Sequence, residues 1–416
     1  MQRRDFIKSA ATTGLLPFLP ALPLEAAPAA PVDEQIKQRI RSRIHPITAG
    51  ERLERQENAR KLMKEFGFDA MVFEGSVSLN YFTGVSWGRS ERLFAMVLPQ
   101  KGEPHYIAPK FEESRAREQV GSVAVSTWEE DKSPYELMKR IFKDLGLATG
   151  TIGMEETTRY LVTENLGKTV SAAKLISGTP VTAGCRSVKS AHEIELMQIA
   201  NDITAEVFKT SLSSLRDGMK EREFAGVVSK LFRDFEVGGG ALVLFGEASA
   251  YPHGLEKDHV LREGDIVLID GGCSVEGYNS DVTRTTSYGK ASEKMEKVWG
   301  IVRKAQDAAL MTAKPGLRAE AVDAAARKVI TDAGYGPDYK YFTHRLGHGI
   351  GMEGHEWYYL VRGNKRLLEP GNIFSDEPGI YIVGEFGIRL EDELLIKEDG
   401  AKLLLPQAES LEKIFG

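Results

Sequence analysis

The sequence predicts an α/β domain followed by an α+β domain that contains a pseudo-twofold internal repeat. Strand-like stretches alternate with helical ones over residues 46–185. Over residues 186–416, an order of helix, glycine turn, helix and hairpin occurs twice. The chain has 416 residues, which is enough for two domains with full cores.

The first half shows the alternation expected of helices that cover a sheet. Ser133 and Pro134 form a good helix start, because serine caps free N–H groups and proline fits the first turn. Apolar runs bounded by turn residues indicate the strands. We expect helices at 50–66 and 133–145, and strands at 70–73, 94–98, 105–108, 123–127 and 151–154.

The second half contains the repeat. Leu196, Ile199, Ile203 and Val207 have the spacing of one face of a helix. A glycine turn separates the two helices of each pair, and a hairpin follows each pair. We expect the helices at 190–215, 221–232, 293–313 and 319–333.

Each hairpin carries two carboxylates. Asp270 ends a buried apolar run, and Asp281 lies about equally far beyond the next turn, so we expect the two to face each other across the ladder. Glu377 and Glu391 repeat this arrangement, and a glycine-rich segment supplies His348. Four carboxylates and one imidazole form a hard, oxygen-rich ligand set for divalent cations. Four negative charges balance two dications, which indicates a two-metal hydrolytic site.

The motifs around these residues resemble those of the creatinase, aminopeptidase P and prolidase group of "pita-bread" metallopeptidases, peptidase family M24. The resemblance extends from about residue 46 to residue 416 and includes a creatinase/prolidase-like N-terminal domain at 46–185, before a catalytic domain at 186–416. It implies that Asp270 chelates one metal and that His348 and Glu377 bind the second. It also implies that Asp281 and Glu391 bridge the two. The motifs are LIDGG at 268–272, NSDVTRT at 279–285, GHGIG at 347–351, DEPGIY at 376–381 and RLED at 389–392.

The same resemblance assigns five supporting residues. It implies that His253 holds the substrate or leaving group and that His355 contacts the scissile carbonyl. His344 falls in the site, while Arg389 and Tyr381 match positions beside the metals and on the substrate side. Arg389 is also open to a purely structural reading as an ion-pair partner, and Tyr381 to one as a core residue. The other histidines, which we expect to be solvated or locally bonded, are His45, His105, His192 and His259.

The implied activity is hydrolysis of the bond between an N-terminal residue and proline, by a hydroxide that bridges the metals. Glu377 is the candidate for carrying the proton to the leaving nitrogen. The ligand set suits manganese best, with cobalt, zinc or iron as alternatives. The sequence leaves open an aminopeptidase P or a prolidase, and also a metal-dependent hydrolase or lyase acting on a small non-peptide molecule. A methionine aminopeptidase is disfavoured by the N-terminal domain, and a catalytically inactive binding module by the complete ligand set.

Composition limits the partners. Apolar residues make up 42% of the chain and charged residues 27%, which is typical of a globular enzyme. The net charge of −6 and the lack of a long basic block argue against nucleic acid. Residues 31–416 contain no apolar stretch long enough to span a bilayer, so we expect no stable membrane anchor. The family resemblance implies a homodimer or homotetramer.

The N-terminus carries an export signal. Arg3 and Arg4 begin a twin-arginine pattern, followed by a mildly apolar segment and then small residues suited to signal peptidase. We therefore assign 1–30 to a twin-arginine signal peptide and 31–45 to a linker, and expect a periplasmic or secreted protein that uses the twin-arginine translocase. With only Cys185 and Cys273 in the chain, we expect two reduced, buried thiols.

Overall fold

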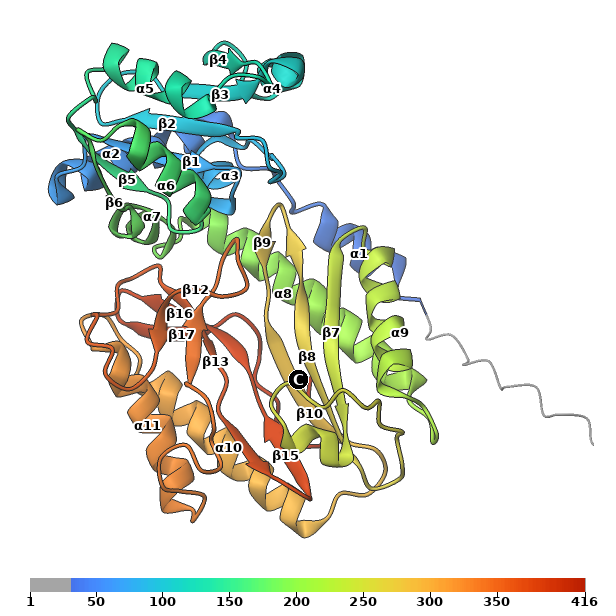
Figure 1. Cartoon of the computed structure of the whole chain (residues 1–416). Coiled ribbons are helices and arrows are strands. Elements are labelled where there is room, and N and C mark those ends of the chain that lie inside the picture. Colours follow the sequence, from blue (N-terminus) through green and yellow to red (C-terminus); the bar gives the residue numbers. More distant parts are fainter. Residues whose placement is uncertain (1–30, 416) are drawn as a thin grey trace, which may run out of the picture.

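The computed structural model describes residues 31–415, so the expected signal peptide at 1–30 lies outside the described residues. Figure 1 shows a smaller N-terminal domain above a larger C-terminal domain, with helix α8 (Ala191–Ser211) running from the junction into the larger one. Within residues 31–415, no helix combines the length and the apolar character needed to cross a bilayer.

The N-terminal domain is a six-stranded sheet covered by helices on both faces. The strand order is β4-β3-β2-β1-β5-β6, in which β1 to β3 pair antiparallel and the other pairs are parallel. One apolar cluster packs under α2, α3, α4 and α7, and another under α5 and α6. The strands are β1 (Ala70–Glu74), β2 (Ala95–Pro99), β3 (His105–Pro109), β4 (Ala124–Trp128), β5 (Thr151–Met154) and β6 (Lys174–Ser177). The helices are α2 (Ala49–Phe66), α3 (Val77–Thr83), α4 (Glu113–Val120), α5 (Pro134–Asp144), α6 (Tyr160–Thr169) and α7 (Thr179–Arg186).

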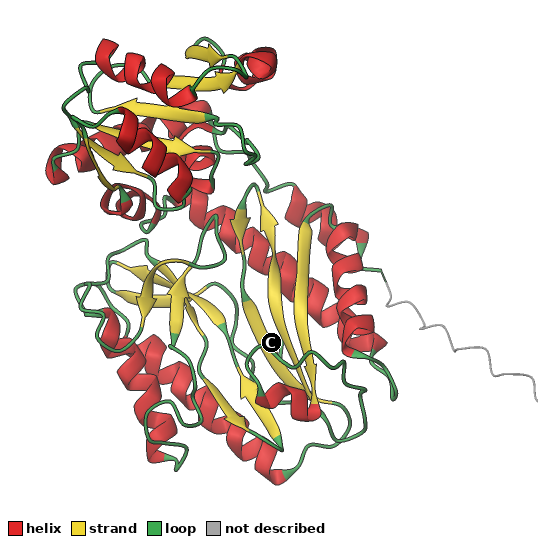
Figure 2. Cartoon of the chain, viewed as in Figure 1, coloured by secondary structure: helices red, strands yellow, loops and turns green. Residues whose placement is uncertain are grey.

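The C-terminal domain has two halves of similar construction, as the repeat predicted. In each half a pair of helices packs on the outer face of an antiparallel sheet, and Figure 2 shows these helices outside and the strands between them. The first half contains α8, α9 (Glu221–Asp234), β7 (Gly238–Phe245), β8 (Ile266–Val275), β9 (Tyr278–Asn279) and β10 (Val282–Ser287). The second contains α10 (Glu293–Thr312), α11 (Ala319–Asp332), β11 (Gly347–Gly349), β12 (Glu356–Leu360), β13 (Ile373–Asp376), β14 (Gly379–Ile382), β15 (Phe386–Arg389), β16 (Asp392–Lys397) and β17 (Gly400–Leu403).

A β-bridge between Thr283 of β10 and Glu391 joins the two halves. The N–H of Glu391 donates to the carbonyl oxygen of Thr283 over 3.1 Å. The Thr283 hydroxyl also lies 2.6 Å from Oε2 of Glu391 and 2.8 Å from Oδ1 of Asp270. The seam between the halves therefore passes directly between carboxylates of the predicted ligand set.

Reciprocal capping fixes the two helices that flank the domain junction. Thr48 and Glu51 form a capping box at the start of α2, and Ser190 and Glu193 form one at the start of α8. Glu51 also bonds His192 of α8, with 2.7 Å between Oε1 and Nδ1. The first turns of these helices are thus tied to each other across the junction.

The structure adds elements that were not predicted from the sequence, among them α3, α4, α6, α7 and β6 of the N-terminal domain. The predicted linker at 31–45 contains helix α1 (Glu34–Arg41), capped by the Asp33 side chain. Ile40 of α1 is buried in the same core as α8, so apolar burial orders a stretch that was predicted to be a linker. Strand β7 was not predicted, because its first three residues are glycines, which have low strand propensity.

Both cysteines are buried and free. Cys185 lies in the core of the N-terminal domain and Cys273 in the core of the first half of the C-terminal domain. Burial raises the pKa of each thiol to about 12, so both are protonated at neutral pH.

Candidate metal centre

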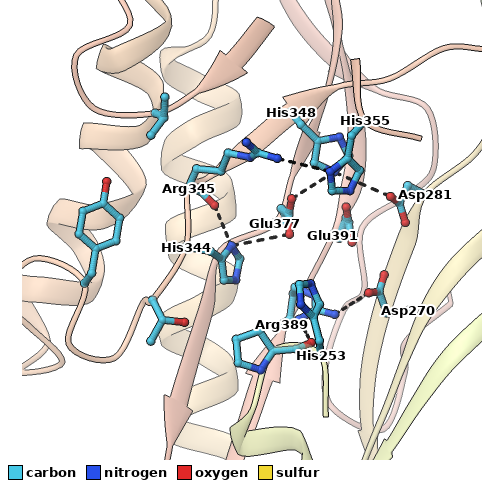
Figure 3. Close-up of a pocket in the computed structure, with 14 residues that line it drawn as sticks. His253, Asp270, Asp281, His344, Arg345, His348, His355, Glu377, Arg389 and Glu391 are labelled. Atoms are coloured by element: carbon cyan, nitrogen blue, oxygen red, sulfur yellow. Dashed lines mark hydrogen bonds and ion pairs between the residues drawn. The ribbon is translucent and has the colours of Figure 1, made fainter. Parts of the chain in front are cut away.

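A cavity of about 440 Å³ opens along the seam between the two halves of the C-terminal domain. Figure 3 shows that carboxylates and histidines from both halves point into it. All five predicted ligands line the cavity, and so do His253, His344, His355 and Arg389. Its other lining residues are Pro252, Tyr339, Thr343, Arg345 and Val361.

The first pair of carboxylates is placed differently from our prediction. Asp270 stands opposite Thr283 in the β8–β10 ladder, so it does not face Asp281 directly. Asp281 lies two residues before Thr283, in the break between β9 and β10. Side chains two residues apart project to the same side of a strand, so both carboxylates still enter the cavity. The expectation of direct cross-strand pairing was wrong, because strand register cannot be read from distances to a turn.

A glycine permits the chain to fold back closely at this break. A Cβ atom on Gly272 would lie 2.0 Å from the carbonyl oxygen of Ser280, a separation that no side chain tolerates. The Ser280 hydroxyl accepts the N–H of Cys273 over 3.0 Å and so takes part in the same close approach. The LIDGG motif therefore positions Asp281 as well as Asp270.

The second pair of carboxylates lies at the middle of one long hairpin. Asp376 pairs with Asp392 in β13 and β16, and Gly379 pairs with Arg389 in β14 and β15. Glu377 and Glu391 lie in the break between these two sets of pairs. They are at equivalent positions on the two strands, so these carboxylates face each other as the sequence predicted.

The five residues fall into two groups that share one carboxylate. Ligand atoms of Asp270, Asp281 and Glu391 lie within 4.8 Å of one another, and so do those of His348, Glu377 and Glu391. A further group joins Asp281, His348 and His355 within the same distance. Two adjacent cation positions with Glu391 between them fit this geometry.

The carboxylates repel one another strongly. Burial raises the pKa of Asp281 well above its usual range, and the charges of Asp270 and Glu377 raise it further. Burial followed by repulsion from Asp281 and Glu377 does the same to Glu391. The pKa of Glu377 rises to about 7 through burial, although the Arg389 charge opposes this. A donor set that cannot all ionise unaided fits a site for added positive charge.

Arg389 is the counter-ion of this centre. It is 3% exposed, and its Nη2 donates to Oδ2 of Asp270 over 2.6 Å. Burial opposes ionisation of Asp270, but the Arg389 charge and the Thr283 hydroxyl outweigh it and lower the pKa of Asp270. The remaining Arg389 donors reach Thr283 Oγ1, the carbonyl of Pro252 and the Tyr381 hydroxyl. With its hydrogen bonds directed to the protein, Arg389 fits the structural reading that the sequence left open.

His344 and Tyr381 belong to the same network. His344 Nδ1 donates to the carbonyl of Arg345 over 2.8 Å, so Nε2 accepts from the Tyr381 hydroxyl over 2.7 Å. Burial lowers the pKa of His344 to about 3, and the Arg389 charge lowers it further, so the ring is neutral. Tyr381 is buried, which favours a supporting role over direct contact with a substrate.

His348 presents a free nitrogen to the carboxylates. Its Nδ1 donates to the carbonyl of Gly349 over 3.1 Å, which leaves the Nε2 lone pair facing inward. Nε2 lies 3.4 Å from Oε1 of Glu377 and 3.9 Å from Oδ2 of Asp281. Burial and the neighbouring His355 lower the pKa of His348 to about 3, so the ring is neutral, as a ligand must be.

His253 and His355 are exposed in the cavity. His355 stacks on His348 with 3.7 Å between ring centroids. The histidines expected to be uninvolved make local contacts instead, such as His105 with Ser126 over 2.8 Å.

Sequence reasoning missed Arg345, which also lines the cavity. Its guanidinium packs over the ring of Tyr359 at 4.1 Å and approaches Nδ1 of His355 at 3.4 Å. Among residues 31–415 it makes no ion pair, and its charge acts across the cavity to lower the pKa of Glu377, which burial raises. Its position between His344 and the GHGIG motif was the signal that could have identified it.

Comparison with known proteins assigns the family. Residues 195–398 match Metallopeptidase family M24, and residues 55–188 match the Creatinase/Prolidase N-terminal domain. The chain is 36% identical over 366 residues to an uncharacterized peptidase of Schizosaccharomyces pombe, covering 83% of this chain and 79% of the relative. The chain belongs to metallopeptidase family M24. It is also 33% identical to the Xaa-Pro dipeptidase of Pyrococcus furiosus, covering 84% of this chain and 97% of the relative.

Solved structures of M24 peptidases have the same fold. The dipeptidase PepE from Mycobacterium ulcerans superposes with a TM-score of 0.83 at 31% identity, covering 89% of this chain and 100% of that one. The predicted α/β N-terminal domain and pita-bread catalytic domain are thus confirmed. As an M24 peptidase, the protein is a hydrolase of peptides from a family that uses divalent metal ions.

Proposed function

We propose that the protein is a dinuclear metal-dependent Xaa-Pro dipeptidase of the prolidase type. The observation that carries this is the pair of ligand groups that share Glu391 in one cavity. The full-length similarity to an Xaa-Pro dipeptidase supports the substrate class.

The proposed ligands are Asp270 with Asp281 and Glu391 for one cation, and His348 with Glu377 and the same two bridging residues for the other. When bound, two divalent cations supply Lewis acidity toward water and the scissile carbonyl. We propose manganese first, with cobalt, zinc and iron as alternatives, because all accept this donor set.

The proton path is assigned to Glu377. Glu377 lies in the cavity among the other proposed ligands, where its carboxylate can accept a proton from water and pass it on. Glu377 would take the proton of the attacking water and give it to the proline nitrogen as the peptide bond breaks. The Ser375 hydroxyl donates to Oε1 of Glu377 over 3.1 Å and helps to orient this carboxylate. His344 lines the cavity beside it, with its Nδ1 directed to the Arg345 carbonyl.

The exposed histidines act on the substrate. His355 and His253 border the cavity with ring nitrogens that can donate hydrogen bonds. We assign His355 to the carbonyl oxygen, where negative charge develops during attack, and His253 to the leaving group. Arg389 and Tyr381 hold Asp270 and His344 in place and do not touch the substrate in this assignment.

The guanidinium of Arg345, which lines the cavity and makes no ion pair within residues 31–415, favours a dipeptide over a longer peptide. A dipeptide carries its C-terminal carboxylate directly on the proline, next to the bond that is cut. Arg345 offers planar donors suited to a carboxylate at the cavity wall. A longer peptide has no charge at that point, so it would gain nothing from this residue.

Export and assembly are inferred from the N-terminal motif and from the family resemblance. We infer from the sequence that the twin-arginine translocase exports the chain to the periplasm, and that it acts as a homodimer or homotetramer. Replacing Arg3 and Arg4 by lysine would retain the precursor in the cytoplasm, as cell fractionation would detect. A precursor with both replacements that is still exported would refute the route.

The activity is tested by hydrolysis of matched substrates with the manganese-loaded protein. The set contains an Xaa-Pro dipeptide, an Xaa-Pro-Xaa tripeptide and their alanine-for-proline analogues. We expect cleavage of the proline dipeptide above all. Preference for the tripeptide would indicate an aminopeptidase, and cleavage of none of them with metal bound would indicate a small non-peptide substrate.

A further inference from the structure

The turn that carries His355 is held by a side chain of the other domain. Arg186 is the last residue of α7, so the N-terminal domain extends one residue beyond the boundary predicted from the sequence. Its Nη2 donates to Glu353 over 2.7 Å and to Glu356 over 2.5 Å. Its Nη1 donates to the hydroxyl of Ser78 in α3 over 3.0 Å. Arg186 thus binds side chains that lie two residues before and one residue after His355.

The Glu356 carboxylate accepts several of the hydrogen bonds that hold this turn. Besides Arg186, it accepts from Lys189 Nζ over 3.2 Å and from the N–H of Glu353 over 3.1 Å. The Arg186, Lys189 and Glu356 side chains are at most 2% exposed. Buried charges of this kind add little stability compared with apolar packing, so their use lies in fixing one geometry.

The His355 side chain has few contacts of its own. It is exposed, it stacks on His348, and among residues 31–415 its one hydrogen-bond contact is with the Arg345 guanidinium at 3.4 Å. Its place in the cavity therefore depends on the backbone that carries it. That backbone is fixed from the N-terminal domain, as the guanidinium of Arg186 over the ring of Trp357 further indicates.

We propose that Arg186 is a positioning residue for His355, so that the N-terminal domain takes a direct part in setting the catalytic geometry. The inference goes beyond the proposed function, although its kinetic consequence rests on the role that the proposed function gives to His355. The placement of the turn itself can be measured without any substrate.

The experiment compares Arg186→Met with Arg159→Met in the full-length mature protein. Arg159 is a matched control, because it pairs with the buried Glu74 inside the N-terminal domain at 2.8 Å and does not line the cavity. Hydrogen exchange of the metal-free proteins is followed by mass spectrometry. We expect exchange over residues 351–358 to speed up at least 10-fold in Arg186→Met and to stay unchanged in Arg159→Met.

Kinetics on the best substrate supply the second readout. For Arg186→Met we expect kcat to fall roughly 10- to 100-fold with KM changed less than 3-fold, the range seen when outer partners of site residues are removed. In a His355→Ala background, adding Arg186→Met should lower kcat less than about 3-fold further, because the residue that Arg186 positions is already absent.

The outcomes separate the two claims. Unchanged exchange over 351–358, or a full and independent loss in the His355→Ala background, would overturn the positioning role. Faster exchange with no peptide cleaved by the wild-type protein would support the positioning role and overturn the proposed function instead. If Arg186→Met does not fold, Glu353→Gln removes one partner of Arg186 at a partly exposed site, and it should give the same exchange pattern at smaller amplitude.

Discussion

Arg389 and Asp270 form an ion pair that links the two halves of the catalytic domain in the wall of the cavity, with 2.6 Å between Nη2 and Oδ2. Arg389 comes from the second hairpin and Asp270 from the first. This contact keeps one carboxylate ionised in a group that otherwise resists ionisation.

Replacing Arg389 by glutamine should weaken metal binding without removing a ligand. The pKa of Asp270 would rise, so protons would compete with the metal, and manganese affinity should fall roughly 10- to 100-fold at pH 7. Isothermal titration measures this directly. Arg159→Gln, which removes the partly exposed partner of the buried Glu74 in the N-terminal domain, serves as the control. Unaltered affinity in Arg389→Gln would show that the guanidinium does not tune the centre.

Replacing Asp281 by asparagine should have opposite effects on the metal-free and metal-loaded protein. Burial and repulsion raise the pKa of Asp281, so this carboxyl ionises less readily in the metal-free fold than in the unfolded chain, which destabilises that fold at pH 7. Without metal the variant should melt roughly 1–2 °C higher than wild type, the shift expected for about 1 kcal/mol when the unfolding entropy scales with a chain of 416 residues. With manganese it should gain no stability and show no turnover.

Thermal melts with and without manganese, after treatment with a chelator, test both effects. Asp399→Asn is the control at an exposed carboxylate. A metal-free Asp281→Asn protein that melts below wild type would contradict the repulsion. Normal metal content with full activity would exclude Asp281 as a bridging ligand.

Replacing Arg345 by glutamine should affect substrates according to their terminal charge. The loss of one charge-assisted hydrogen bond should raise KM for an Xaa-Pro dipeptide roughly 10- to 100-fold. For the same dipeptide with an amidated C-terminus, the substitution should raise KM less than about 3-fold. Arg362→Gln, at an exposed arginine paired with Asp338, should behave as wild type. An equal rise in KM for both substrates would show that Arg345 does not bind the C-terminal carboxylate.

Lowering the pH should weaken the contact between α2 and α8 at the domain junction, because it protonates Glu51. Burial opposes ionisation of Glu51, but bonds from Thr48 and His192 outweigh it and lower its pKa to about 2. A lowered carboxyl pKa adds stability above the unfolded pKa of about 4.3, and this is lost as the pH falls toward 2. Glu51→Gln keeps the capping oxygen, so it should cost about 1 kcal/mol at pH 7 and nothing near pH 2.

Urea unfolding of the metal-free proteins at several pH values measures this cost. Glu54→Gln, on the exposed side of the same helix, should show no such pH dependence. A Glu51→Gln penalty that persists below pH 3 would mean that packing, not charge, ties the helices together.

The sequence predicted the repeated helix pairs and the second carboxylate hairpin well, because both follow from local patterns. Apolar spacing marked α8, and equal distances from a turn placed Glu377 opposite Glu391. The same reasoning failed for Asp270, which faces Thr283. The break between β9 and β10 depends on a close backbone contact at Gly272, and such contacts have no local signature.

Residues that act through the tertiary structure were harder to find. Arg186 lies 167 residues from Glu353, and no spacing rule connects them. Arg389 and Tyr381 were predicted near the site, but only the structure shows that their polar atoms are directed to protein groups. The motif indicated which residues belong to the centre, and the fold determined what each of them can touch.

The bridge between Thr283 and Glu391 joins residues that are 108 positions apart. Each half of the domain can build its helices and hairpin from nearby contacts, but the seam requires both halves to be in place. Occupancy of the cavity is therefore also a measure of folding. A ligand that binds only the joined halves raises the free energy of unfolding of the whole domain, and its apparent affinity records how completely the chain has closed.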